Sequence, residues 1–340
     1  MAWLSLQHLQ AARLGLVAQP VKRLPTDNVP RGGARGARDG GGTAYSRGVC
    51  RVGAVLRGER KVTDMSVQSN PEIGRQITTG DIVTNYHDVG EGPALLLLHG
   101  SGPGVSAWAN WRLTIGALSD RFRIVAPDLA GFGFSEVPDG IGYSRQVWLA
   151  QIVAFLDALG LSRVHVVGNS FGGSMALALA IAHPERVERL VLMGSVGVPF
   201  ELTPGLDAVW GYEPSEETMG RLMRESFAYD ASLITDDLVR MRYQASIRPG
   251  VQEKFASMFP APRQRWVDAM AHPESEIRGI PHRTLVIHGR DDKVIPLSTS
   301  LTLLSWIDDA QAHIFGRCGH WTQIEHADDF ARVVAGFLLG

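Results

Sequence analysis

Short apolar strands alternate with helical segments from residue 81 onward, and this rhythm limits the chain to a few folds. Ala94–His99, Val187–Met193 and Thr284–Gly289 are apolar over most of their length, which is typical of strands buried on both faces of a sheet. Helical segments lie between such strands, among them one from Ser144 to about Leu159. The alternation predicts a mostly parallel sheet with helices on both faces.

The stretch 197–278 interrupts this rhythm between two predicted strands. It carries aromatic residues and methionines in helical segments, among them Trp210 and Trp266. An insertion of this size predicts a helical cap over one edge of the sheet. We therefore expect a cap at 197–278 and a core formed by 65–196 and 279–340.

The first 64 residues differ in composition from the rest of the chain. They hold 11 Lys/Arg and 4 Asp/Glu, whereas residues 65–340 hold 22 and 31, and they include the glycine-rich run Arg31–Gly42. We expect 1–64 to be a disordered basic leader. A mis-called start upstream of Met65 and a transit peptide are the alternatives.

The composition of the whole chain excludes several functional classes. A formal charge of −2 gives no chain-wide attraction to nucleic acid. The longest apolar stretches, Ala94–Leu98 and Met175–Ala182, fall far short of the ~18–20 residues that span a bilayer. Two cysteines, Cys50 and Cys318, cannot form a disulfide framework, so we expect a reducing compartment, the cytoplasm.

A candidate nucleophile lies in Gly168-Asn169-Ser170-Phe171-Gly172, which has the pattern G-x-S-x-G. The segment comes directly after an apolar strand and directly before a helix. In that context the pattern places a serine on a tight strand-to-helix turn, with its hydroxyl exposed at the carboxyl edge of the sheet. A glycine–serine turn without chemistry is the alternative, and the context favours Ser170 as the nucleophile.

A nucleophilic serine needs a base and a group that orients the base. Of the eleven histidines, His320 follows the last predicted strand and so reaches the same edge, whereas His165 lies inside a strand. Asp291 and Asp292 both follow a later strand, and the apolar pair after the second of them favours Asp292. Asp128 is a rival that is better interpreted as a loop-capping carboxylate, because it precedes the serine in the chain.

The oxyanion of an acyl-transfer reaction needs backbone amides that are fixed before the reaction, because such donors cost no reorganisation. The run His99–Gly104 supplies exposed glycine-rich backbone after a strand. We expect the amide of Ser101 to pair with that of Phe171 as an oxyanion hole. A phosphate-binding loop is the competing interpretation, but the run lacks G-K-[ST] and no helix opens directly on its glycines.

These residues resemble the α/β-hydrolase fold and, within it, the meta-cleavage product hydrolases, especially the 2-hydroxymuconate semialdehyde hydrolases. The resemblance extends from about Gly80 to Phe337. It implies an eight-stranded, mostly parallel sheet flanked by helices, with a helical cap after the sixth strand. The segments that carry it are SGPGVSAWANWR (101–112), GNSFGG (168–173), RMRYQASIRPG (240–250), FPAPRQRW (259–266) and FGRCGHWTQIEH (315–326).

The resemblance also implies a reaction and its ligands. A 2-hydroxy-6-oxohexa-2,4-dienoate ring-fission product would be cleaved with water at a carbon–carbon bond, giving 2-hydroxypenta-2,4-dienoate and formate or another small acid. Ser170 would attack the C6 carbonyl, Arg242 would bind the C1 carboxylate, and Asn110, Asn169 and Trp321 would hold the 2-hydroxy end. No cofactor or metal is implied. The expected partner is the small dienoate alone, without nucleic acid or membrane, and a dimer or higher homo-oligomer stays open.

Three other functions are weighed against this one. A carboxylesterase of the same fold fits less well, because an arginine and two asparagines around the pocket favour an anionic, polar substrate. A dehalogenase would carry aspartate where Ser170 stands. A hydrolase-fold ligand receptor is the non-enzyme alternative, and the intact serine, aspartate and histidine argue against it.

Deletion of residues 1–64 tests the interpretation of the leader. Because the family resemblance begins only near Gly80, we expect the shortened chain to keep its activity and its thermal unfolding temperature. Both quantities are measured on a chain that starts at Met65, beside the full-length chain. An insoluble product would show that the leader belongs to the fold.

Overall fold

The computed structural model describes residues 70–340, so the expectations for 1–64 lie outside the described residues. The described part contains an eight-stranded sheet with the order β1-β2-β4-β3-β5-β6-β7-β8. Strand β2 is antiparallel to both β1 and β4, and all neighbours from β4 to β8 are parallel. The strands are β1 (Arg75–Thr79), β2 (Ile82–Val89), β3 (Ala94–Leu98), β4 (Arg123–Pro127), β5 (Val164–Asn169), β6 (Val187–Met193), β7 (Thr284–Gly289) and β8 (Ala310–Phe315).

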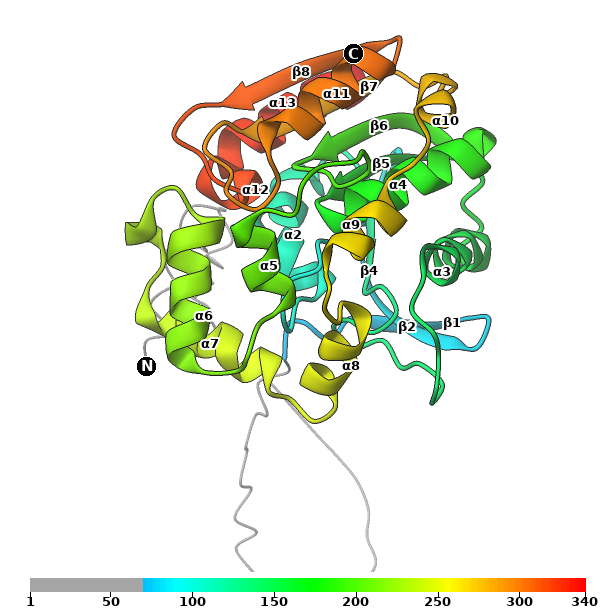
Figure 1. Cartoon of the computed structure of the whole chain (residues 1–340). Helices are drawn as coiled ribbons and strands as arrows, with labels where there is room; N and C mark the ends of the chain where they lie inside the picture. Colours follow the sequence, from blue (N-terminus) through cyan, green and yellow to red (C-terminus); the bar gives the residue numbers. More distant parts are fainter. Residues whose placement is uncertain (1–69) are drawn as a thin grey trace, which may run out of the picture. The chain divides into compact units, whose positions relative to one another are not determined.

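Helices cover both faces of this sheet (Figure 1). On one face α2 packs with α13, and on the other α3 packs with α4, while α11 contacts β7 and β8. The core helices are α2 (Ala107–Leu118), α3 (Arg145–Ala158), α4 (Phe171–Ala182), α11 (Leu297–Trp306), α12 (Thr322–Glu325) and α13 (Ala327–Leu339), with the short 3₁₀ turn η1 (Pro184–Arg186) before β6.

The apolar run of β3 shows why the sheet needs two helical layers. Successive side chains of a strand point to opposite faces. Leu95 and Leu97 join the apolar cluster that contains Trp111 of α2, whereas Leu96 and Leu98 join the cluster that contains Phe155 of α3. All four leucines are fully buried, and each such side chain contributes about 1.5–3 kcal/mol by leaving water.

A helical segment lies between β6 and β7, in the stretch where the cap was expected, and the elements from α5 to α10 are called the cap below. Its elements are α5 (Pro204–Trp210), α6 (Glu216–Arg221), the π-helical turn η2 (Leu222–Phe227), the 3₁₀ turn η3 (Ala231–Leu233), α7 (Asp236–Ser246), α8 (Val251–Met258), α9 (Gln264–Met270) and α10 (Glu274–Arg278). Aromatic rings stabilise it from within: Trp210 stacks on Phe259 with 4.5 Å between ring centroids.

The predicted fold class is confirmed, and the four elements with predicted bounds agree with β3, α3, β6 and β7 to within one residue. Strand β1 and helix α12 were not predicted. Strand β1 (RQITT) is mostly exposed at the sheet edge, so it lacks the apolar signal of a buried strand. Helix α12 has only four residues, too few for a periodic pattern. No helix within residues 70–340 is long and apolar enough to cross a membrane.

Candidate active site

The turn at Ser170 has the backbone geometry expected of a nucleophile between a strand and a helix, but the residue is buried and lines a cavity instead of lying exposed as expected. Ser170 adopts φ 54° and ψ −115° between β5 and α4, a backbone conformation that L-residues rarely take. The turn is tight because its neighbours lack side chains: a Cβ on Gly172 would lie 2.3 Å from the carbonyl oxygen of Leu98, and one on Gly168 would lie 2.4 Å from that of Gly172. The helix can therefore approach the sheet closely and lift the serine above its carboxyl edge.

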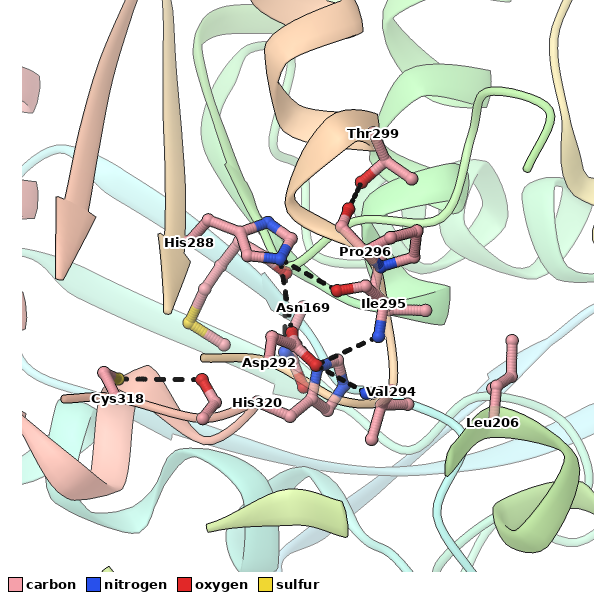
Figure 2. Close-up of polar contacts among 12 residues, drawn as sticks. Asn169, Leu206, His288, Asp292, Val294, Ile295, Pro296, Thr299, Cys318 and His320 are labelled. Atoms are coloured by element: carbon pink, nitrogen blue, oxygen red, sulfur yellow. Dashed lines mark hydrogen bonds and ion pairs between the residues drawn. The ribbon is translucent and has the colours of Figure 1, made fainter. Parts of the chain in front are cut away.

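Asp292 and His320 meet at the same edge of the sheet (Figure 2). The Nδ1 atom of His320 lies 2.7 Å from Oδ2 of Asp292, and both side chains are buried. The other carboxylate oxygen, Oδ1, accepts hydrogen bonds from the amides of Val294 (2.8 Å) and Ile295 (3.0 Å). The loop after β7 thus fixes the carboxylate, and the carboxylate in turn orients the imidazole.

Ser170 and His320 line one cavity, together with Ser101, Arg242 and Trp321. Among residues 70–340 the structure records no hydrogen bond between the Ser170 hydroxyl and His320. Catalytic hydrogen bonds are often long in free enzymes and tighten once substrate is bound. The arrangement brings a hydroxyl, an imidazole and a carboxylate together in the chain order serine, aspartate, histidine that this architecture uses.

The amides of Ser101 and Phe171 lie at the ends of neighbouring strands, β3 and β5, which pair in parallel. Phe171 is the first residue of α4, so its N–H has no partner within the helix. Ser101 is buried and its Oγ accepts a hydrogen bond from Nε1 of Trp210 in α5 (3.0 Å). A cap residue therefore holds the segment expected to provide the oxyanion hole.

The two rival aspartates lie in different surroundings. Asp128 is fully buried, and its carboxylate accepts hydrogen bonds from the amides of Ala107 (2.6 Å) and Phe134 (2.8 Å) and from Nδ2 of Asn85 (2.7 Å). Burial raises the pKa of Asp128 to about 7, although these donors oppose the shift. Asp291 accepts from the amide of Arg317 (3.0 Å), outside the cavity. Neither aspartate contacts His320.

Two arginines from different layers line the cavity, Arg112 of α2 and Arg242 of α7. Arg242 donates through Nη2 to the carbonyl oxygen of Gly104 (2.6 Å), and its Nη1 lies 3.7 Å from Oε1 of Glu72. Burial lowers the pKa of both arginines, and the charge of Arg242 adds to the effect on Arg112. Two neighbouring buried cations beside one carboxylate form a site that favours an anionic ligand.

The polar residues expected around the 2-hydroxy end of the substrate also line the cavity. Oδ1 of Asn110 accepts from the amide of Gly100 (3.2 Å), while its Nδ2 is buried without a hydrogen-bond partner among residues 70–340. Asn169 donates to the carbonyl oxygen of Met193 at 3.5 Å. Trp321 stacks on Phe227 of the cap with 4.7 Å between ring centroids. An unpaired buried amide N–H₂ in a cavity that two arginines also line suits an oxygen-rich ligand.

Sequence reasoning missed Arg112, Glu72 and Gln323. Arg112 stands two positions after Asn110 in the same helix, so a charged residue close to the oxyanion segment was the available signal. Gln323 donates to the carbonyl oxygen of Asn110 (3.4 Å) and lines the cavity. Glu72 gave no signal, because it lies in the short segment before β1 and meets Arg242 only through tertiary packing.

Cys318 lies beside His320 but is not available as a nucleophile. Its side chain is fully buried, and burial raises the pKa of the thiol to about 12. A protonated thiol is a poor nucleophile. Among residues 70–340, no group of three or more His, Cys, Asp or Glu side chains is placed to hold a metal ion.

Comparison with known proteins places the chain among hydrolases. Residues 93–327 match the family described as alpha/beta hydrolase fold. The chain is 60% identical over 271 residues to a 2-hydroxymuconate semialdehyde hydrolase of Pseudomonas sp. strain CF600, covering 80% of this chain and 95% of that protein. It is also 60% identical over 269 residues to a 2-hydroxy-6-oxo-2,4-heptadienoate hydrolase of Pseudomonas putida F1, covering 79% and 97%.

A solved structure gives the same result. The chain is 56% identical, with a TM-score of 0.78, to a meta-cleavage product hydrolase from Pseudomonas fluorescens IP01, covering 79% of this chain and 98% of that one. That structure is of a serine-to-alanine variant complexed with acetates. The fold, the cavity and these identities agree, and the chain belongs to the meta-cleavage product hydrolases of the α/β-hydrolase fold.

Proposed function

We propose that this enzyme hydrolyses the C5–C6 bond of a 2-hydroxy-6-oxohexa-2,4-dienoate, giving 2-hydroxypenta-2,4-dienoate and formate or another small acid. The observation that carries the proposal is that one cavity holds Ser170, His320 and the two guanidinium groups of Arg112 and Arg242. Relatives named for 2-hydroxymuconate semialdehyde and 2-hydroxy-6-oxo-2,4-heptadienoate support the substrate class.

The reaction needs an electron sink, because its leaving group is a carbanion. A proton moves from the 2-hydroxyl group to C5, so that the dienol becomes a ketone with a conjugated carbonyl group. We assign the C1 carboxylate to Arg242, whose planar guanidinium can bind it bidentately. Asn110, Asn169 and Trp321 are assigned to the 2-oxygen, which must gain and lose a proton while it stays bound.

Ser170 then adds to the C6 carbonyl carbon, and His320 takes the hydroxyl proton while Asp292 stabilises the imidazolium. The amides of Ser101 and Phe171 are assigned to the oxyanion. Collapse of the resulting tetrahedral intermediate breaks the C5–C6 bond, and its electron pair passes into the conjugated ketone to form the dienolate, which takes the proton from the His320 imidazolium. Water, deprotonated by His320, releases the acid from Ser170.

The wall of the cavity beyond the catalytic groups favours a small apolar C6 substituent. Leu206, Val209, Met219 and Met223 of the cap line it together with Val294 of the core. A carboxylate at that end would lose its hydration without gaining a charged partner, which is costly. The relatives named for 2-hydroxymuconate semialdehyde and 2-hydroxy-6-oxo-2,4-heptadienoate favour a small group, so hydrogen or methyl is the proposed C6 substituent.

A spectrophotometric assay with three yellow ring-fission products tests the proposal. We expect the products of catechol and 3-methylcatechol to have kcat/KM values at least about tenfold above that of the 2,3-dihydroxybiphenyl product, because a phenyl group must displace packed cap side chains. The loss of yellow colour gives the rate. Turnover of simple esters without any turnover of the three dienoates would favour the carboxylesterase alternative.

The remaining assignments concern where and with what the enzyme works. We propose that it acts in the cytoplasm on a free dienoate, without nucleic acid or a membrane surface. The two cysteines of the chain and its formal charge of −2 support these assignments.

A further inference from the structure

A second buried histidine touches the carboxylate of the proposed triad. His288 is the fifth residue of β7 and is fully buried. Its Nε2 lies 3.0 Å from the carbonyl oxygen of Ile295 and 3.4 Å from Oδ2 of Asp292 (Figure 2). Its Nδ1 lies 2.7 Å from Oγ of Ser300 in α11. The ring thus stands between the loop that carries Asp292 and the helix that follows it.

The partners of His288 determine its tautomer. A carbonyl oxygen only accepts, so Nε2 must carry a hydrogen and donate to Ile295, with Asp292 on the same side as a second acceptor. Nδ1 then accepts from the Ser300 hydroxyl, which fixes the orientation of the ring. Burial lowers the pKa of His288, so the ring is neutral and leaves the charge of Asp292 for His320.

We propose that His288 is a positioning residue for Asp292, which it holds by donating to Ile295 and by presenting its Nε2–H to Oδ2 of the carboxylate. The amide of Ile295 already donates to Oδ1 of Asp292 (3.0 Å). His288 binds the carbonyl oxygen of the same residue. It thereby fixes the peptide segment whose amide donates to Asp292. The 2.7 Å contact between Asp292 and His320 depends on the position in which these hydrogen bonds hold the carboxylate.

Few other ionisable groups lie near this network. The neighbouring Lys293 is exposed. The remaining titratable side chains belong to the outer part of the β7 loop and to the His320 loop: Asp291, Cys318 and Glu325. All of them are kept unchanged in the experiment, so a shift in the pH dependence reports on the His288 contacts.

The test compares His288→Leu, His288→Gln and Ser300→Ala with the control His165→Leu. His165 is a buried histidine of β5, which is separated from β7 by β6, and it packs edge-on against Phe122. In each full-length variant, kcat and KM are measured across the acidic limb of the pH profile, which reports deprotonation of the catalytic base.

We expect His288→Leu to lower kcat by about 10- to 100-fold, the usual cost of losing a supporting contact around a functional group, with KM changed by less than about threefold. The acidic limb of kcat/KM moves to lower pH, because a loosened Asp292 stabilises the His320 imidazolium less. His288→Gln keeps an N–H donor for Ile295 and restores most of kcat. Ser300→Ala shifts the acidic limb in the same direction, but by a smaller pH interval than His288→Leu. The His165→Leu control leaves the position of the limb unchanged.

The proposal would be overturned if the acidic limb of the kcat/KM profile does not shift in His288→Leu, or if it shifts equally in the His165→Leu control. If His288→Leu does not fold, Ser300→Ala decides, and an unshifted limb in that variant has the same meaning. The inference rests on the proposed triad but not on the substrate. The profiles are therefore measured on whichever substrate the wild-type enzyme turns over, dienoate or p-nitrophenyl ester, so a wrong substrate assignment is recognised separately.

Discussion

Replacement of Ser170 by alanine is expected to lower kcat on the dienoate by about 10⁴- to 10⁶-fold, the range found when a triad nucleophile is removed. Two other candidates are poorly placed to replace it: the Ser101 hydroxyl, which also lines the cavity, accepts a hydrogen bond from Trp210, and the Cys318 thiol is buried and protonated. Among residues 70–340 the structure records no hydrogen bond of the Ser170 hydroxyl. The fold should therefore survive the change, and circular dichroism and thermal unfolding check that it does.

The matched control is Ser174→Ala, the same substitution one turn further along α4. The Ser174 hydroxyl is buried and donates to the carbonyl oxygen of Met270 (2.7 Å), so its loss should cost stability, about 1 kcal/mol for a neutral hydrogen bond. Its effect on kcat should be small. Retention of more than about 1% of wild-type kcat in Ser170→Ala would contradict the nucleophile assignment.

Replacement of Arg242 by alanine is expected to reduce kcat/KM on the dienoate by about 10²-fold or more. Truncating one member of a buried, hydrogen-bonded charge pair costs about 2–5 kcal/mol, and the C1 carboxylate would lose its proposed partner. Ester substrates without a carboxylate should be affected much less. The measured quantity is the ratio of kcat/KM on the dienoate to kcat/KM on a p-nitrophenyl ester.

Two features of the structure sharpen this experiment. Arg242 also donates to the carbonyl oxygen of Gly104, so part of its loss could act through the oxyanion segment, and ester hydrolysis reports that part. Arg240→Ala is the control on the same helix, because Arg240 is exposed and pairs only with Asp237 (2.9 Å) among residues 70–340. If Arg242→Ala lowers kcat/KM equally on the dienoate and on the ester, the result would indicate a folding defect and not the loss of a carboxylate-binding site.

Local signals made most of the fold predictable from the sequence. The apolar run of β3, the serine cap of α3 and the glycines around Ser170 each determine the backbone of a few adjacent residues. Strand β1 could not be predicted in the same way, because a polar edge strand is specified by its pairing with β2 and not by its own pattern.

The candidate site likewise contains residues that local sequence signals predict and contacts that they do not predict. Ser170, Asp292 and His320 each follow a strand, so the topology of the sheet brings them to one edge. The contacts of Glu72 with Arg242 and of His288 with Ile295 depend on how loops and the cap pack in three dimensions. No spacing in the sequence encodes such contacts, and only the folded structure shows them.

The hydrogen bonds that join the cap to the segment after β3 have a consequence for engineering. Trp210 donates to the Ser101 hydroxyl and Arg242 to the Gly104 carbonyl oxygen, so two donors from the cap hold the segment after β3, one through a side chain and one through the backbone. A chimera that takes its cap from a relative must bring an indole and a guanidinium at these positions, or both acceptors lose their partners. Substrate scope and catalytic alignment are therefore inherited together when caps are exchanged, and a cap library for this scaffold should keep Trp210 and Arg242 constant.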